Sequence, residues 1–122
     1  MSEKVTASIL IIGNEILSGR TQDVNISYIA KTLGDWGIVV EHCRVIPDVE
    51  QIIIDTVNEV RSEYDYIFTT GGIGPTHDDI TAECIAKAFS VGLEQNEEIA
   101  SRIKKRPAPD DVMKSRLRMA RV

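Results

Sequence analysis

A glycine-rich stretch in the middle of the chain carries the residue types best suited to chemistry. It runs from Thr69 to Thr81 and reads TTGGIGPTHDDIT, after the apolar run Tyr66-Ile67-Phe68. Thr70, Gly71, Gly72 and Gly74 form the turn itself, and the glycines lack a β-carbon, so the backbone can take positive φ and bring its amides close to an anion. The pattern predicts a phosphate cradle between a strand and a helix.

Two adjacent carboxylates, Asp78 and Asp79, follow this turn at once. They would repel a bare anion unless a cation or a proton intervened, so the pair suggests a site for a metal-bound phosphate. We expect a divalent cation held by Asp78 and Asp79, with magnesium, manganese and cobalt all left open. Asp79 has an equally plain structural alternative, which is to cap the following helix or stabilise its dipole.

A second polar group follows the first apolar run of the chain, and its candidate ligand residues are Asn14, Glu15, Ser18, Gly19, Arg20 and Asp23. Asn14 and Glu15 come just past the strand end, where side chains face a ligand crevice. Arg20 could bind a phosphate through two nitrogens, although a lone loop arginine is usually solvated. Asp23 could equally cap the helix that contains Ile26, and by itself that reading would be preferred.

These motifs lie on an alternating series of strands and helices. Strands are expected at residues 5–12, 38–46 and 66–70, and helices near residues 25–33, 47–62 and 79–89. The βαβαβα order predicts an α/β fold: a three-layer αβα arrangement with a mostly parallel open sheet. Because the carboxyl ends of parallel strands share one edge, we expect the glycine loop to face a pocket also lined by Asn14, Glu15 and Asp23.

The pattern weakens after Ser90. A short strand is expected at residues 91–94, a helix capped by Asn96 through Lys105, and a proline break at residues 107–109 before a final helix. The cluster at residues 104–106 is expected to be a solvated face. By contrast, the spacing of Arg116, Arg118 and Arg121 could place a basic edge against an anionic ligand or a neighbouring subunit.

Composition limits the remaining possibilities. A chain of 122 residues with a formal charge of −5 is one domain, and this charge argues against nucleic acid as the main partner. We expect a cytoplasmic protein without a membrane contact, because the amino terminus is too short for a signal peptide or a span. Cys43 and Cys84 are expected to be buried free thiols, and His77 a surface residue. No Walker-type lysine, nucleophile elbow or zinc-type spacing is present.

The stretch from Thr69 to Thr81 resembles the signature loop of the molybdopterin-binding (MoaB/MogA-like) domain. With Pro75, His77, Asp78 and Asp79 it is most similar to the CinA-type competence/damage-inducible subfamily. A second match runs from Ile12 to Arg20 and continues through Asp23 and Asn25 to Tyr28. In the resembled domain the chain continues with a further strand and a closing helix. The resemblance therefore implies one domain over residues 1–122 that lacks these elements.

The resemblance also implies roles. Asp79 matches the loop aspartate with a catalytic or metal-positioning role, and Asp23 matches the family's other functional aspartate. Asp78 departs from the arginine of the MoaB/MogA branch, which should favour a divalent cation over direct anion binding. The implied ligand is a nucleotide or pterin phosphate, and the implied reaction is metal-dependent hydrolysis of an ADP-ribose-like or FAD-like pyrophosphate.

Two alternatives to this reaction stay open: adenylyl transfer to molybdopterin during molybdenum cofactor biosynthesis, and a non-catalytic binding or oligomerisation module. The resemblance further implies a homo-oligomer, with a trimer as the expected state.

Overall fold

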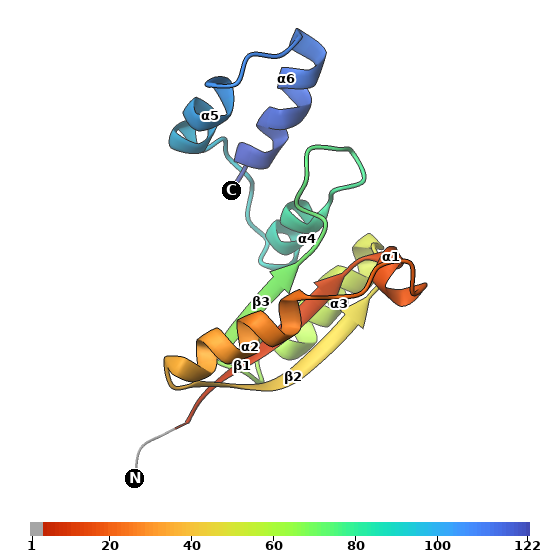
Figure 1. Cartoon of the computed structure of the whole chain (residues 1–122), viewed down its shortest axis with the longest axis vertical. Helices are drawn as coiled ribbons and strands as arrows, with labels where there is room; N and C mark the ends of the chain where they lie inside the picture. Colours follow the sequence, from red (N-terminus) through yellow and green to blue (C-terminus); the bar gives the residue numbers. More distant parts are fainter. Residues whose placement is uncertain (1–3) are drawn as a thin grey trace.

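The computed structural model describes residues 4–122, which are built around a parallel sheet of three strands (Figure 1). The strands are β1 (Val5–Ile12), β2 (Ile38–Ile46) and β3 (Tyr66–Thr70), in the order β2-β1-β3. Both neighbours of β1 run parallel to it, so all three strands end at the same edge of the sheet. β1 is apolar almost throughout because it is the central strand and is buried on both faces.

Helices cover both faces of this sheet. In Figure 1, α2 (Asn25–Asp35) lies in front of the strands and α3 (Glu50–Val60) lies behind them. α3 packs against α4 (Thr81–Ala88) on its side of the sheet. Each α/β crossover therefore returns the chain to the next parallel strand, as right-handed βαβ units do. The predicted three-layer αβα arrangement is confirmed.

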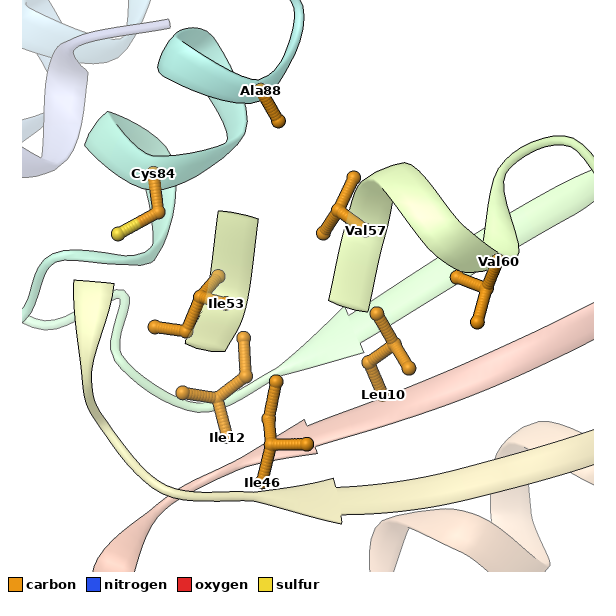
Figure 2. Close-up of a cluster of buried hydrophobic side chains, with 8 residues drawn as sticks. All are labelled: Leu10, Ile12, Ile46, Ile53, Val57, Val60, Cys84 and Ala88. Carbon is orange, nitrogen blue, oxygen red and sulfur yellow. The ribbon is translucent and has the colours of Figure 1, made fainter. Parts of the chain in front are cut away.

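The larger part of the core lies between the sheet and the α3–α4 layer (Figure 2). Leu10 and Ile12 of β1 contact this layer, and Ile53 and Val57 of α3 lie above them (Figure 2). Alternate residues of β1, namely Ala7, Ile9 and Ile11, are buried on the α2 side because successive strand side chains point to opposite faces. Ser8 is the polar exception, and its hydroxyl is satisfied by His42 Nδ1 at 2.7 Å.

The carboxyl-terminal part forms a separate helical lobe above the sheet (Figure 1). It contains α5 (Glu97–Lys104), α6 (Asp110–Leu117) and the short 3₁₀ helix η1 (Arg118–Ala120). The Asn96 side chain accepts a hydrogen bond from the Ile99 amide at 3.0 Å, which confirms the predicted cap of α5. The proline break before α6 is also confirmed, because Pro109 immediately precedes that helix.

Several element predictions differ from the structure. The chain turns into a short helix, α1 (Asn14–Leu17), directly after β1, and the sequence pattern did not indicate it. Residues 91–94 do not form a strand within the described chain. Instead, Gln95 pairs with Arg121 in an isolated antiparallel bridge. The Glu94 and Val122 amides exchange hydrogen bonds with each other's carbonyls at 2.9 and 2.8 Å, so the pairing partner comes from the far end of the lobe.

The two cysteines lie in different environments. Cys84 is buried in the α3–α4 core as predicted, and burial raises the pKa of its thiol to about 11. Cys43 is exposed, so its prediction as a buried thiol was wrong. Cys43 lies on β2, an edge strand of the sheet, and its side chain points to the opposite face from those of His42 and Arg44. No helix within residues 4–122 is both long and apolar enough to span a membrane.

Candidate functional site

The glycine loop follows β3 and ends at α4, as the sequence predicts. Gly71 and Gly72 have φ values of 90° and 66°, a region that favours glycine. A β-carbon on Gly71 would overlap the carbonyl oxygen of Ile12, because the loop turns directly over the end of β1. Thr81 closes the loop: its hydroxyl donates to the Gly71 carbonyl at 2.8 Å and its amide to the Gly72 carbonyl at 3.1 Å. The backbone is thus fixed at the carboxyl edge of the sheet.

Asp79 folds back over this loop. Its Oδ2 accepts hydrogen bonds from the Thr76 amide at 2.9 Å and the Thr76 hydroxyl at 2.8 Å. Desolvation alone would raise the pKa of Asp79, but these bonds, the Gly74 amide and the charge of Arg118 outweigh it, and the pKa is lowered. The helix α4 has Ile80 at its N-cap with no side-chain cap bond among the described residues. The alternative role of Asp79 as a helix cap is therefore wrong, and its carboxylate stays ionised near the glycines.

Asp48 is the main residue of this edge that sequence reasoning did not select. It follows β2, and its pKa is raised by partial burial and by the negative charges of Asp79, Glu15 and Asp78, in that order. Its Oδ1 is buried without a hydrogen-bond partner among residues 4–122. The strand-end rule could have found Asp48, because Pro47-Asp48 follows β2 as Asn14-Glu15 follows β1. The sequence reading instead treated those two residues as a helix start, whereas α3 begins at Glu50.

The residues after β1 divide into two groups. Asn14 joins the acidic edge, since its Oδ1 accepts a hydrogen bond from the Asp48 amide at 3.2 Å, and Glu15 is one of the charges acting on Asp48. Ser18, Gly19 and Arg20 are exposed, and the Arg20 Nε donates to Ser18 Oγ at 3.2 Å within the same loop.

Asp23 and Asp79 have different hydrogen-bond partners. Its Oδ2 accepts a hydrogen bond from the Ile26 amide at 2.9 Å, which is the capping contact of the alternative reading. Its charge acts on Cys43 of β2, and it is not among the main charges acting on Asp48 or Asp79. The role of Asp23 in metal placement therefore stays a prediction.

His77 and Asp78 lie at the exposed tip of the loop. Their side chains are 86% and 82% exposed, and His77 Nε2 lies 3.4 Å from Asp78 Oδ1. His77 is a surface residue as predicted. Asp78 contributes charge to the acidic edge through its effect on Asp48 but is held by no residue of the sheet or of its helices within the described chain.

A pocket of about 230 Å³ opens beside the glycine loop. The loop side consists of Gly72, Ile73, Gly74 and Asp79, and the other side comes from the carboxyl-terminal segment through Arg118, Met119, Arg121 and Val122. Asn14, Glu15 and Asp23 are not among its lining residues, so the lobe completes this pocket, and a pocket shared with those three residues stays a prediction. Arg116 is not part of it; its Nη1 donates to the Arg106 carbonyl at 3.4 Å.

Whether these groups fit a divalent cation can be judged from their oxygens. The unpartnered Oδ1 of Asp48 and the neighbouring charges of Asp79, Glu15 and Asp78 suit a hard cation. However, no three acidic, histidine or cysteine side chains of residues 4–122 form a ready metal cage. An ion such as magnesium needs no such cage, because it binds through one or two carboxylates and completes its shell with water and phosphate oxygens.

A parallel αβα sheet with a glycine loop and carboxylates at its carboxyl edge defines a ligand-binding domain of the open α/β class. Residues 8–121 match the family described as "Probable molybdopterin binding domain". The chain belongs to this molybdopterin-binding (MoaB/MogA-like) family, and its relatives identify it as CinA-like.

Two curated relatives illustrate this. A "CinA-like protein" of Syntrophotalea carbinolica is 40% identical over 98 residues, which is 80% of this chain and 24% of that protein. A "Probable FAD synthase" of Caenorhabditis elegans is 40% identical over 99 residues, which is 81% of this chain and 19% of that protein. The chain thus spans about a quarter or less of the length of these two relatives.

Solved structures agree with the fold. The protein CinA of Thermoplasma acidophilum, described as of unknown function, has a TM-score of 0.87 and 33% identity, covering 98% of this chain and 72% of that one. The molybdopterin biosynthesis enzyme MoaB of Thermus thermophilus has a TM-score of 0.64 at 19% identity, covering 87% and 66%. The second likeness concerns the fold alone.

Proposed function

We propose that this domain binds the phosphates of a nucleotide or pterin at the glycine loop and hydrolyses the pyrophosphate of an ADP-ribose-like or FAD-like molecule with a divalent cation. The observation that carries the proposal is the convergence of Gly72, Gly74, ionised Asp79 and Arg118 on one pocket. Backbone amides and a guanidinium are phosphate ligands, whereas a carboxylate beside them calls for a cation. The relative named as an FAD synthase supports a nucleotide-type ligand.

The side chains suit different tasks in such a reaction. Water adds to one phosphorus, the bridging P–O bond breaks, and two phosphate monoesters result. Asp79, with its lowered pKa, remains charged and can hold a cation or orient water. Asp48 lies outside this pocket, and its unpartnered Oδ1 can bind the cation at the neighbouring acidic edge. A bound divalent cation would supply neutralisation of the charge that develops on the phosphoryl oxygens.

The test is turnover of ADP-ribose and FAD with magnesium, manganese or cobalt, in the wild type and in Asp79→Asn. The amide oxygen of asparagine can still accept the Thr76 hydrogen bonds, so the fold should be retained. Loss of the charge should lower metal-dependent turnover by roughly 100-fold or more, the scale of removing one electrostatic group from a phosphoryl site. Asp35→Asn is the matched control, because Asp35 is exposed at the end of α2 and away from the glycine loop, and its loss should change turnover by less than about twofold.

Three other outcomes of this experiment would each change the assignment of function. Adenylyl transfer from ATP to molybdopterin without pyrophosphate hydrolysis would favour the biosynthetic alternative, which the match to a family described as a probable molybdopterin binding domain supports. Binding of nucleotide without turnover under every metal would establish a binding module. Equal hydrolysis by the wild type and Asp79→Asn would remove Asp79 from the mechanism.

A further inference from the structure

The glycine loop contains no lysine or arginine between Thr69 and Thr81, and it forms one side of the pocket. The cationic side comes from residues about forty positions later. Arg118 at the start of η1 and Arg121 just after it both line the pocket opposite Gly72 and Gly74. Each arginine can bind a ligand only with the donors that its protein contacts leave free.

Arg121 is occupied by protein contacts. Its Nη2 donates to Glu83 Oε1 at 2.6 Å and its Nε to the Arg118 carbonyl at 3.4 Å. This short contact with Glu83 uses the carboxylate that could otherwise neutralise Arg118. Arg121 therefore acts mainly as an anchor between α4 and the carboxyl-terminal segment.

Several N–H groups of Arg118 are not used in close hydrogen bonds with the described residues. Its Nη2 makes two long contacts, with the Asp79 carbonyl at 3.4 Å and with Glu83 Oε1 at 3.3 Å. Its Nε is buried and has no hydrogen-bond partner within residues 4–122. A buried N–H without a partner is unfavourable, and an arginine presents its donors in a fork that matches two phosphate oxygens. The side chain as a whole is 30% exposed and lines the pocket, so a ligand there can reach the Nη groups, whereas the Nε stays buried.

The backbone holds Arg118 in this position. The Asn96 amide donates to the Ala120 carbonyl at 2.7 Å, and Ala120 is fully buried against the lobe. The charged groups that face Arg118 are Glu83 of α4, Asp79 of the glycine loop and Arg121. Glu83 is held more closely by Arg121 and the Asp79 carboxylate by Thr76, so Arg118 keeps only long contacts, at 3.3 Å with Glu83 and at 3.4 Å with the Asp79 carbonyl.

We propose that Arg118 is the phosphate-binding cation of the glycine-loop pocket and selects a diphosphate-containing ligand. This inference rests on the proposed function, because it assigns a residue to the same site. The ligand's phosphate oxygens accept from the Arg118 Nη–H groups while the Gly72–Gly74 backbone faces them from the opposite side. A neutral nucleoside gains nothing from this contact, so the effect belongs to the phosphates.

The test compares binding of inorganic pyrophosphate, ADP and adenosine by titration calorimetry, with and without magnesium. Arg118→Met keeps most of the apolar stem and removes the guanidinium. It should weaken pyrophosphate and ADP binding by roughly tenfold or more and leave adenosine binding unchanged. Arg106→Met is the matched control, since Arg106 is exposed on the same lobe outside this pocket and should change affinity by less than about twofold. Arg118→Lys should recover part of the loss, because charge returns without the fork.

The outcomes separate the two ideas. Equal pyrophosphate binding by the wild type and a folded Arg118→Met protein overturns the role of Arg118 and leaves the proposed function standing. Arg118-dependent binding without hydrolysis of any nucleotide overturns the hydrolysis and leaves the phosphate site. If Arg118→Met unfolds, the Arg118→Lys comparison decides, and undiminished binding there overturns the bidentate contact. Absence of pyrophosphate and ADP binding by the wild type overturns both.

Discussion

Asp48 and Asp79 lie at one edge of the sheet, and their pKa values are shifted in opposite directions. Asp79 is stabilised as a carboxylate by Thr76 and Gly74, whereas Asp48 is partly buried among the charges of its neighbours. Such divergence of neighbouring carboxylates is typical of functional sites, although structural groups also show it. Gathering these negative charges at one edge of the sheet therefore lowers the stability of the folded protein.

Asp48→Asn should stabilise the protein at neutral pH. Because the folded-state pKa is raised, the ionised group is unfavourable above it, and the free energy of unfolding falls as pH rises from the ordinary value of 3.8 through the folded value. Removing the charge should raise the free energy of unfolding at pH 7 by on the order of 0.5 kcal/mol, with no gain below the ordinary value. Urea unfolding at several pH values measures this. Glu63→Gln, at an exposed turn, is the control for net charge, and an equal gain there would attribute the effect to overall repulsion.

Gly71→Ala should be much more damaging than Gly19→Ala. Both glycines have positive φ, at 90° and 79°, so alanine is strained at either position by about 1 kcal/mol. Only at Gly71 would the new β-carbon overlap the Ile12 carbonyl, whereas Gly19 faces open space. We expect Gly71→Ala to cost at least about 2–3 kcal/mol in unfolding free energy and to weaken phosphate binding. Similar costs at the two positions would mean that the loop relaxes without contacting β1.

At the level of elements, Glu83 of α4 links this helix to the carboxyl-terminal lobe by hydrogen bonds with two arginines. Glu83 Oε1 accepts from both Arg121 at 2.6 Å and Arg118 at 3.3 Å. The hydrogen bond from Arg121 is the main reason that the pKa of Glu83 is lowered. The stabilisation is therefore complete above the ordinary pKa of 4.5 and is lost as pH falls through the folded-state value.

Glu83→Gln should loosen the lobe more than it unfolds the sheet. Glu83 is 36% exposed, so solvent screening limits the loss to about 1 kcal/mol at pH 7, and the difference from wild type should vanish at low pH. Hydrogen exchange should increase in residues 94–122 while β1 stays protected. Glu98→Gln removes an exposed pair with Arg102 on α5 and should change stability by less than about 0.5 kcal/mol. Uniform exchange throughout the chain would contradict the anchoring role.

At the scale of the whole molecule, we predict a homo-oligomer, with a trimer as the expected state. Large apolar side chains near the carboxyl-terminal lobe are exposed, including Val91 at 61% and Phe89 at 48%. Exposed apolar surface of this kind is typical of a subunit contact. Sedimentation velocity at micromolar concentration measures the state. Val91→Ser should shift it toward monomer, whereas Val24→Ser, at a 74% exposed site near α2, should not. A monomeric wild type would contradict the prediction.

The family was indicated by the resemblance of residues 69–81 and 12–28 to a known domain, and the sequence by itself determined the sheet and the position of the glycine loop. These features depend on local patterns: the unbroken apolar run of β1, the 3.6-residue periodicity of α3, and glycines at positions where positive φ is required. Asn96 could be assigned as a cap for the same reason, since capping acts within three residues. The resemblance of residues 69–81 to the family's signature loop is what placed Gly71, Gly72 and Asp79 in one motif.

Only the tertiary structure decided which groups share the site. Asp48 lies at the acidic edge because β2 runs parallel to β1. Arg118 lies beside the glycines because the lobe folds back over α4. Neither contact could be predicted from the spacing of residues along the chain. The hydrogen bond between the Asp79 carboxylate and the Thr76 amide also depends on the path of the loop. The sequence alone therefore could not distinguish a helix-capping role of Asp79 from a hydrogen bond within the loop. Long-range contacts are decided by how elements pack, and packing is a property of the whole core.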